Sequence, residues 1–294
     1  MKKLYDLWPF NFGTIKRQDF SAAKVVVLPI PYEATVSSGT GTSAGPQAII
    51  ESSRELDELD DPKETGEVIG LHATDIFTLD EVNVSKNSAL EAIAGIEQAV
   101  NNEVIRHNKI PLMLGGEHTI TIGAVRALRK KYRDISILHL DAHTDLMNSL
   151  DGTKYSHACT MRRISELKIP FVSIGIRNMN PEVREYIKAK KLKNIYFAPE
   201  IPPLEKILKG LTKNVYLTFD LDCLDPSIMP SVGTPEPGGL GWYQVLEIIN
   251  KVAAKVNLVG ADVVELKPIP GLDAPNFLAA KLTYNIIINL LRNK

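Results

Sequence analysis

Short apolar runs alternate with longer amphipathic segments along most of the chain. The apolar runs predict strands at residues 24–30, 68–77, 110–114, 135–140, 171–176, 194–198, 215–219 and 257–264. Helical spacing of apolar residues, with cap residues and prolines near the starts, predicts helices at 46–58, 85–106, 121–132, 181–191, 202–210, 241–254 and 273–292. Strands that alternate with helices in this way form a mainly parallel sheet with helices on both faces.

The alternation runs through the chain without an obvious linker, an internal repeat or a low-complexity tract. We therefore predict a single α/β domain over residues 1–294. A TIM barrel is the competing architecture at this length, and the apolar pattern alone does not exclude it.

Composition narrows the classes of function. A hydrophobic content of 44% and a charged content of 23% are typical of a soluble globular protein. The net charge of -1, without a basic stripe, argues against a nucleic-acid partner. No apolar run approaches the roughly 20 residues that span a bilayer, and Asp6 and Pro9 interrupt any signal-like segment. We expect a cytoplasmic protein with no membrane partner, whose Cys159 and Cys223 are small buried side chains.

The strongest chemical signal follows the strand predicted at 135–140. Asp141, His143 and Asp145 are spaced by two, so in an extended segment their side chains point to one side. Two carboxylates and an imidazole are poor core residues but suitable ligands for a divalent cation. A polar turn after a strand is the alternative for this stretch taken alone.

Two other predicted strands end in the same residue types. His118 follows the strand at 110–114, and Asp220 and Asp222 follow the strand at 215–219. Ligands of open α/β sheets bind beyond the carboxyl ends of the strands, so the three clusters can converge. Because four ionised aspartates in one pocket would repel one another, two divalent cations would balance their charge. Many oxygen atoms and two imidazoles favour Mn, although Fe, Co or Zn could bind.

Each cluster also has an ordinary structural explanation. His118 could be a polar residue at a helix N-terminus, and Asp220 and Asp222 could form a turn before a proline. We leave Glu117 and His139 out of the predicted ligand set. The direction of the His139 side chain relative to the cluster depends on the strand staying regular.

Several motifs together resemble a known family. GGEHT, DAHTD, YSHAC and FDLDCLDP, followed by GTPEPGGL and DVVELKP, are similar to the motifs of the ureohydrolases, which include arginases and agmatinases. The resemblance extends from about residue 28 to the last predicted helix. It implies a three-layer α/β/α domain with an eight-stranded parallel sheet, two Mn²⁺ ions and a homotrimer or homohexamer. It therefore favours this fold over the TIM barrel.

The resemblance also implies a role for each site residue. The two ions would share two bridging aspartates, and their ligand sets would be His118, Asp141, Asp145 and Asp220 for one ion and Asp141, His143, Asp220 and Asp222 for the other. His157 matches the family's non-ligand histidine, and Glu265 matches the acid that faces the substrate guanidinium. Without the family, His157 would be an ordinary loop histidine and Glu265 an ordinary charge at a strand end.

These residue types suit hydrolysis of a guanidinium, which is resonance-stabilised and a poor electrophile toward water. A pair of cations lowers the pKa of bound water and supplies hydroxide at neutral pH. Glu265 can hold and orient the guanidinium, and Asp145 can accept a hydrogen bond from the hydroxide. His157 can carry a proton to the leaving amine. We therefore predict a hydrolase that releases urea and an amine.

The loop at residues 146–156 bears on which guanidino compound is the substrate. Arginases resemble one another in an Asn at the position of Met147, and that departure weakens an arginase reading. YSHACTMRRI and GTPEPGGL look more like agmatinases, so we predict agmatine as substrate, with putrescine and urea as products. Guanidinobutyrate is the second choice, because Lys154, Arg162 or Arg163 could meet a carboxylate, although the two arginines could equally be structural. Arginine and formimidoylglutamate remain further alternatives.

Other classes of function fit less well. A two-metal phosphoesterase usually needs further histidine ligands late in the chain, whereas all six histidines lie before residue 158. The motifs of metal-dependent deacetylases differ from GGEHT and DAHTD. A non-enzymatic regulatory relative would have lost a ligand or His157, and none is missing. We expect an enzyme whose partner is a small guanidino molecule.

Overall fold

The fold is built on one open, parallel sheet, seen in a computed structural model that describes residues 9–15, 18–37, 39–56 and 73–292. The strand order is β2-β1-β3-β8-β7-β4-β5-β6, and the neighbouring strands pair in parallel. The strands are β1 (Val25–Ile30), β2 (Ile76–Thr78), β3 (Ile110–Gly115), β4 (Ile135–Leu140), β5 (Phe171–Ile176), β6 (Ile195–Phe197), β7 (Asn214–Asp220) and β8 (Asn257–Val264). The predicted eight-stranded parallel sheet is confirmed, and the TIM-barrel alternative is wrong.

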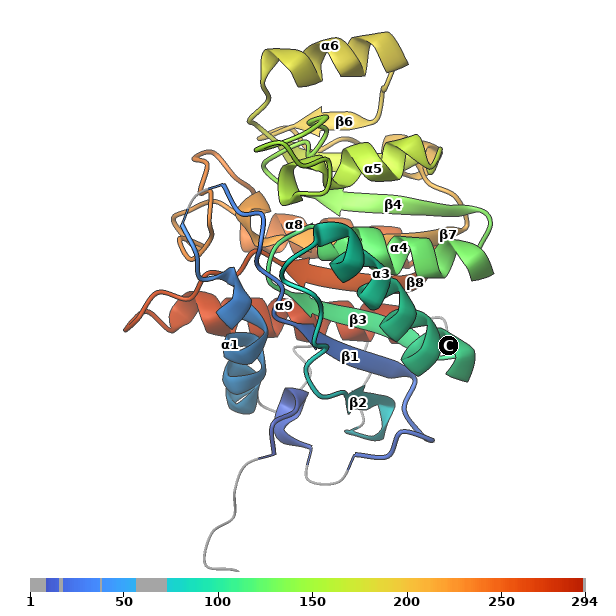
Figure 1. Cartoon of the computed structure of the whole chain (residues 1–294), viewed down its shortest axis with the longest axis vertical. Helices are drawn as coiled ribbons and strands as arrows, with labels where there is room; N and C mark the ends of the chain where they lie inside the picture. The colour runs from blue at the N-terminus through green and yellow to red at the C-terminus, as the bar shows by residue number, and fades with distance from the viewer. Residues whose placement is uncertain (1–8, 16–17, 38, 57–72, 293–294) are drawn as a thin grey trace, which may run out of the picture.

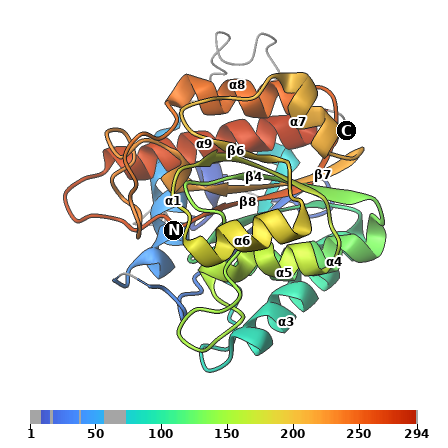
Figure 2. The same ribbon diagram turned by 90° about the horizontal axis from the view of Figure 1, so that it is seen from above.

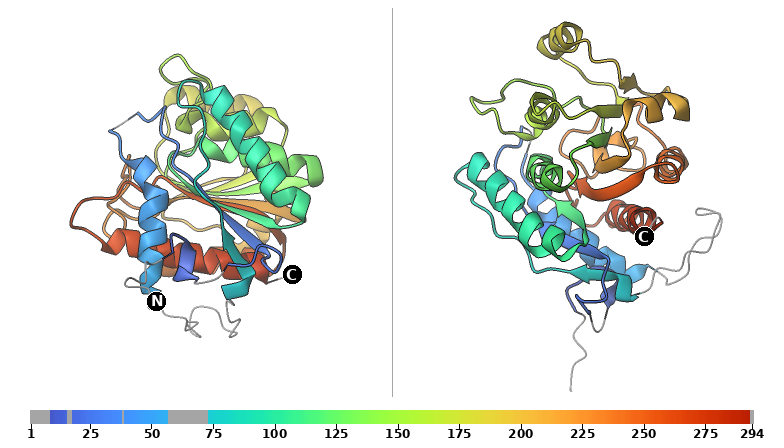
Figure 3. Two further views of the ribbon diagram at one scale, coloured as in Figure 1. Left: turned by 60° about the horizontal axis from the view of Figure 1, so that its bottom comes forward. Right: turned by 90° about the vertical axis from the view of Figure 1, so that its right-hand side faces the viewer.

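Helices cover both faces of the sheet and make three layers (Figures 1 and 2). One face carries α1 (Gly45–Ser52), α7 (Leu204–Gly210), α8 (Trp242–Ala253) and α9 (Ala274–Leu291). The other face carries α3 (Ala89–Ala99), α4 (Ile120–Lys131), α5 (Thr160–Glu166) and α6 (Pro181–Lys190). Two further views show the sheet twisting between the two helical layers (Figure 3).

The strands are apolar on both faces because each face packs against a helical layer. Along β1, Val25 and Val27 join the core under α1 and α9, while Val26 and Leu28 join the core under α3 and α4. Every residue of this strand is buried. A strand buried on both sides reads as a continuous apolar run, which explains why the runs were visible in the sequence.

Several element boundaries differ from the prediction. The helix predicted to start at residue 85 begins at Ala89, because the Ser88 hydroxyl caps it by accepting the Glu91 N–H at 3.3 Å. The short helix α5 was not predicted. Of the strand predicted at 68–77, residues 68–72 lie outside the described part of the chain, as do the last two residues of the helix predicted at 46–58. Among the described residues, no helix is both long and apolar enough to cross a membrane.

Candidate metal centre and active site

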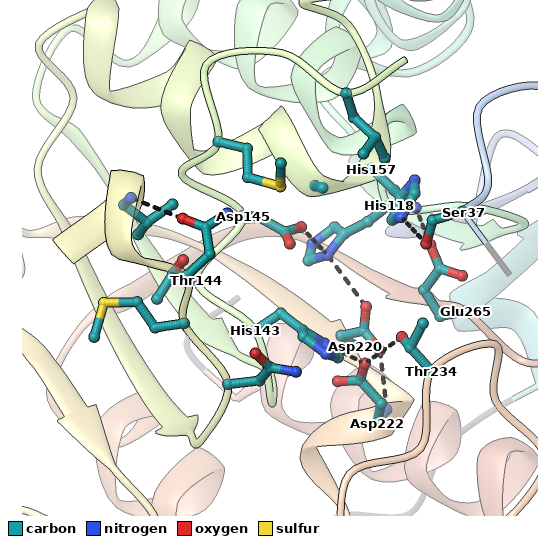
Figure 4. A pocket seen from close by; sticks show the side chains of 17 residues that line it. Ser37, His118, His143, Thr144, Asp145, His157, Asp220, Asp222, Thr234 and Glu265 are labelled. Atoms are coloured by element: carbon teal, nitrogen blue, oxygen red, sulfur yellow. Dashed lines mark hydrogen bonds and ion pairs between the residues drawn. The ribbon is translucent and has the colours of Figure 1, made fainter. Parts of the chain in front are cut away.

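The four central strands bring the predicted site residues to one edge of the sheet. β3, β8, β7 and β4 are neighbours in that order, and their carboxyl ends lie together. His118 follows β3, Asp141 follows β4, Asp220 is the last residue of β7, and Glu265 follows β8. Figure 4 shows the side chains of His118, Asp145 and Asp220 pointing toward one another across the site.

The turn that carries His118 is packed against the loop after β1. The Glu117 N–H donates to the Tyr32 carbonyl oxygen at 2.9 Å. A Cβ on Gly116 would lie 2.0 Å from the same oxygen, so only glycine allows this close approach. Gly116 of the GGEHT motif therefore allows the turn that carries His118 to pack against this loop.

A buried ring nitrogen of His118 faces three carboxylates. Its Nδ1 lies 3.1 Å from Asp145 Oδ2 and 3.3 Å from both Asp141 Oδ2 and Asp220 Oδ2. This nitrogen is buried without a hydrogen-bond partner of good geometry among the described residues. Four ligand atoms that converge on one point, with an unpartnered imidazole nitrogen among them, fit a divalent cation.

A second group of ligand atoms lies beside the first. His143 Nδ1 is 2.8 Å from Asp222 Oδ2 and 3.6 Å from Asp141 Oδ1. The ligand atoms of Asp141, His143 and Asp222 all lie within 4.8 Å of one another, and Asp141 also belongs to the group around His118. The structure thus brings together all six predicted metal ligands, with Asp141 between the two groups.

The charges of this cluster conflict in the protein alone. Burial raises the pKa of Asp220 well above its usual value, and the neighbouring Asp222 and Asp141 charges raise it further. Burial would lower the pKa of His143, but hydrogen bonds to Asp141 and Asp222 raise it to about 12. The site thus favours protonation of some aspartates and keeps a neighbouring histidine protonated. A pair of divalent cations would remove this electrostatic conflict by balancing the charge of the carboxylates.

His139 lies in the cluster and was left out of the predicted ligands. Its Nε2 is 2.8 Å from Asp141 Oδ2, and its Nδ1 is 2.9 Å from Ser173 Oγ. Because both ring nitrogens have partners within the protein, the ring is suited to orient Asp141 rather than to bind an ion.

A hydrogen-bond chain beneath the cluster fixes the tautomer of His118. His118 Nε2 lies 2.8 Å from Thr218 Oγ1, and the Thr218 hydroxyl donates to Asp262 at 2.6 Å. Asp262 also accepts the hydroxyls of Thr121 and Tyr216, each at 2.7 Å. Since Thr218 donates to Asp262, it accepts from Nε2–H, so in the neutral ring Nδ1 carries no proton and can bind a cation. The sequence reasoning missed Asp262, whose only signal was one acid inside the apolar run NLVGADVV.

His157 and Glu265 complete the wall of the cavity. His157 Nδ1 lies 2.8 Å from the Thr35 carbonyl oxygen, and its Nε2 is 3.2 Å from Ser37 Oγ. A carbonyl only accepts, so Nδ1 carries the proton and Nε2 is free to exchange one. Glu265 Oε1 accepts the His118 N–H at 2.7 Å. Burial raises the pKa of Glu265 well above its usual value.

Two of the predicted catalytic residues have left-handed backbone. The φ angles are 51° at Asp145 and 68° at Glu265. For residues other than glycine this conformation costs on the order of 1–2 kcal/mol. Backbone held in such a conformation by its surroundings is common at active sites, because it aims side chains that relaxed backbone would point elsewhere.

The site opens into a cavity of about 260 Å³. Away from the metal cluster, its wall is apolar at Met147, Leu150, Met179 and Val183. Among the described residues that line it, none is a lysine or an arginine. These lining residues therefore offer no cation at the end remote from the cluster.

The arginines considered for a substrate carboxylate have other partners. The Arg162 guanidinium lies 3.5 Å from the centre of the Tyr186 ring, and its Nε is 3.3 Å from Glu166. Arg163 donates to Glu166 at 3.1 Å and to the Asn148 carbonyl at 3.4 Å. Arg162 thus links α5 to α6, and Arg163 links α5 to the loop of Asn148.

Arg177, which the sequence reasoning also missed, holds the loop of Asp222. Its guanidinium donates to the Asp222 and Glu236 carbonyl oxygens, each at 2.7 Å, and to three more carbonyls nearby. Cys159 and Cys223 are buried and free, as predicted.

Nearly the whole chain is similar to known proteins of one family. Residues 23–289 match the sequence profile of the arginase family. An N(1)-aminopropylagmatine ureohydrolase from Synechocystis is 35% identical over 277 residues, covering 91% of this chain and 89% of that protein. An agmatinase from Bacillus cereus is 35% identical over 254 residues, covering 85% and 86%. The solved agmatine ureohydrolase of Thermoplasma volcanium has a TM-score of 0.79 at 29% identity, covering 98% of this chain and 96% of that one.

Proposed function

The chain belongs to the arginase family and is a ureohydrolase, and from this premise we propose that it hydrolyses agmatine to putrescine and urea with two Mn²⁺ ions. The observation that carries the proposal is the position of His118 Nδ1. Among the described residues it has no hydrogen-bond partner of good geometry, and it faces three carboxylates in the cavity that Glu265 lines.

The residues that would hold the ions are the six predicted ligands. One group is His118, Asp141, Asp145 and Asp220, and the other is Asp141, His143, Asp220 and Asp222. When bound, such a pair of cations makes hydroxide available at neutral pH and offsets the charge of the carboxylates. The mixture of carboxylate oxygens and imidazoles supports Mn²⁺.

Substrate binding falls to Glu265 and the apolar wall. One Glu265 oxygen is held by the His118 N–H, which leaves the other oxygen for charge-assisted hydrogen bonds to the guanidinium. Met147 and Leu150 provide contacts for a chain of methylene groups. Asp145, whose Oδ2 lies 3.1 Å from His118 Nδ1, would accept a hydrogen bond from the nucleophilic water.

His157 would handle the proton of the leaving group. An amine cannot leave as an anion, so its nitrogen must gain a proton as the C–N bond breaks. Nδ1 of His157 is committed to the Thr35 carbonyl, so the proton would pass from Nε2. Ser37 Oγ, 3.2 Å from this atom, can keep it aimed into the cavity.

The charge at the end of the cavity remote from the His/Asp cluster supports a substrate whose tail carries an amine rather than a carboxylate. With no lysine or arginine among the described lining residues, the carboxylate of guanidinobutyrate or arginine would lack a cationic partner. Two acids lie behind the wall of the cavity: Glu236 bonds to the lining residue Asn178, and Glu182, next to the lining residue Val183, accepts the Asn148 N–H at 3.2 Å. A cationic amine suits this surrounding.

N(1)-aminopropylagmatine is the second candidate substrate. A relative that acts on it, by its name, is 35% identical over 91% of this chain. Its longer, more cationic tail would extend past Leu150 and Val183 toward Glu182.

Urea release after Mn²⁺ loading tests the proposal, with agmatine, N(1)-aminopropylagmatine, guanidinobutyrate and arginine compared by kcat/KM. We expect agmatine to have the highest value. A higher value for N(1)-aminopropylagmatine would replace the proposed substrate but keep the site chemistry. Urea from none of the four, with two ions bound, would refute the proposal.

A further inference from the structure

The fully buried Glu117 side chain is one residue from His118, yet it binds no part of the metal cluster. Its Oε2 accepts the backbone N–H groups of Ala34 at 2.8 Å and Thr35 at 2.7 Å. Its Oε1 accepts the hydroxyls of Thr35 at 2.5 Å and Thr119 at 2.6 Å. Both oxygens are therefore fully occupied by protein donors, and neither is left for a cation.

The residue that Glu117 holds most firmly is the one that fixes His157. Thr35 gives Glu117 both its N–H and its hydroxyl, and its carbonyl accepts the proton of His157 Nδ1 at 2.8 Å. The backbone of the same turn also binds this loop, because the Glu117 N–H donates a hydrogen bond to the Tyr32 carbonyl oxygen. The position of the His157 ring thus depends on a loop whose place is set by Glu117.

We propose that Glu117 is a positioning residue for His157. By holding Thr35, it keeps the carbonyl at Nδ1, which keeps the proton on Nδ1 and leaves Nε2 toward the cavity. The inference rests on the proposed role of His157 as the proton carrier. Loss of Glu117 would release the loop, and the ring would sample both tautomers and several orientations.

Two substitutions separate position from charge. In Glu117→Gln the amide oxygen can still accept both backbone N–H groups, and the amide NH₂ can donate to the hydroxyls of Thr35 and Thr119, which accept as well as donate. This variant loses the charge and keeps the clamp. Glu117→Ala loses both and leaves the N–H groups of Ala34 and Thr35 without this acceptor.

The ¹⁵N NMR signals of the His157 ring report which nitrogen carries the proton. They are recorded on protein loaded with Mg²⁺, because Mn²⁺ would broaden them, and are assigned with His157→Ala. We expect one Nδ1–H tautomer in the parent and in Glu117→Gln, and a mixture in Glu117→Ala. The matched control is Glu33→Ala, which removes a similar carboxylate clamp, on Thr42 and Ser43, without touching Thr35. An unchanged tautomer in Glu117→Ala would overturn the proposal.

Kinetics with the best substrate give the second test. We expect Glu117→Ala to lower kcat about tenfold or more with little change in KM, and Glu117→Gln to stay within about threefold. In a His157→Ala background, Glu117→Ala should cost no further activity. An equal loss in both backgrounds, or a loss of bound metal, would overturn the proposal and assign Glu117 to the metal site.

Failure of the proposed function and failure of the proposed role of Glu117 can be told apart. If no guanidino compound is hydrolysed, the proposed function falls, while the NMR comparison still decides whether Glu117 holds His157. If Glu117→Ala does not fold, Thr35→Val provides a milder comparison, because it removes one of the four groups that donate to Glu117. We expect this variant to show a partial mixture of His157 tautomers. A single unchanged tautomer would overturn the proposal.

Discussion

Two aspartates of neighbouring strands are equally buried but have opposite surroundings. Asp262 in β8 accepts three hydroxyls, from Thr121, Tyr216 and Thr218. Asp220, at the end of β7, accepts the Asp222 N–H and otherwise faces other carboxylates and Nδ1 of His118. Burial raises the pKa of both aspartates.

Partners, rather than burial, therefore distinguish a structural acid from a site acid. Asp262 has enough hydroxyl donors to be accommodated by the protein alone. Asp220 sits where like charges accumulate and where an imidazole nitrogen lacks a partner, so its surroundings call for a cation. The contrast predicts opposite consequences when each carboxylate is removed.

The largest effect is expected for Asp220→Ala. Urea release should fall at least about 10³-fold, because the oxygen ligand that we propose for both ions is lost. The metal-free protein should stay folded, since the substitution removes a repelled carboxylate. Urea assays measure the activity, metal analysis measures the number of bound ions, and circular dichroism shows whether the metal-free variant stays folded. Retained activity with two bound ions would contradict the ligand assignment.

Asp262→Ala should act on stability first. Three buried hydroxyls would lose their acceptor, at a cost of about 2–4 kcal/mol in the free energy of unfolding. Thermal unfolding of the metal-free variant, beside metal-free Asp220→Ala, measures the difference. If Asp262→Ala were as stable as Asp220→Ala, the hydroxyl network would not be the structural element inferred from the geometry.

The metal-free protein should lose stability as pH rises above about 6.5. The folded state holds protons on His143, whose pKa is about 12, and on His118, whose pKa is well above its usual value. Stability from these protons is present below the unfolded pKa of about 6.5 and is lost as pH rises toward the folded values. As the pH rises from about 6.5 to about 9, the melting temperature should fall when a chelator is present and should change less when Mn²⁺ is bound. A metal-free protein that gains stability over this range would contradict the charge balance described for the cluster.

The smallest effect is expected for Arg162→Ala. Its guanidinium stacks on Tyr186 outside the cavity, so kcat/KM for agmatine should change less than about twofold. The same assay with guanidinobutyrate is the comparison. A selective loss of activity toward the carboxylate substrate would return Arg162 to the binding site.

The fold could be predicted because both sheet faces are buried, which makes apolar runs that stand out from amphipathic helices. Asp141, His143 and Asp145 could be identified as a cluster because they are close in sequence. The helix α5 was missed because it is only seven residues long and carries two arginines in TMRRISE. Glu117, Asp262 and Arg177 could not be assigned from the sequence, since most of their partners lie 44 to 141 residues away along the chain.

The left-handed backbone at Asp145 and Glu265 also has a consequence for engineering this enzyme. Glycine is the residue that such backbone accepts most readily, whereas these two positions keep charged side chains. A library selected only for thermal stability would therefore be free to accumulate glycine at both positions and would lose the carboxylates that we propose bind the substrate and the nucleophilic water. Screens for a more heat-resistant form should hold these two codons fixed, or select for turnover in every round.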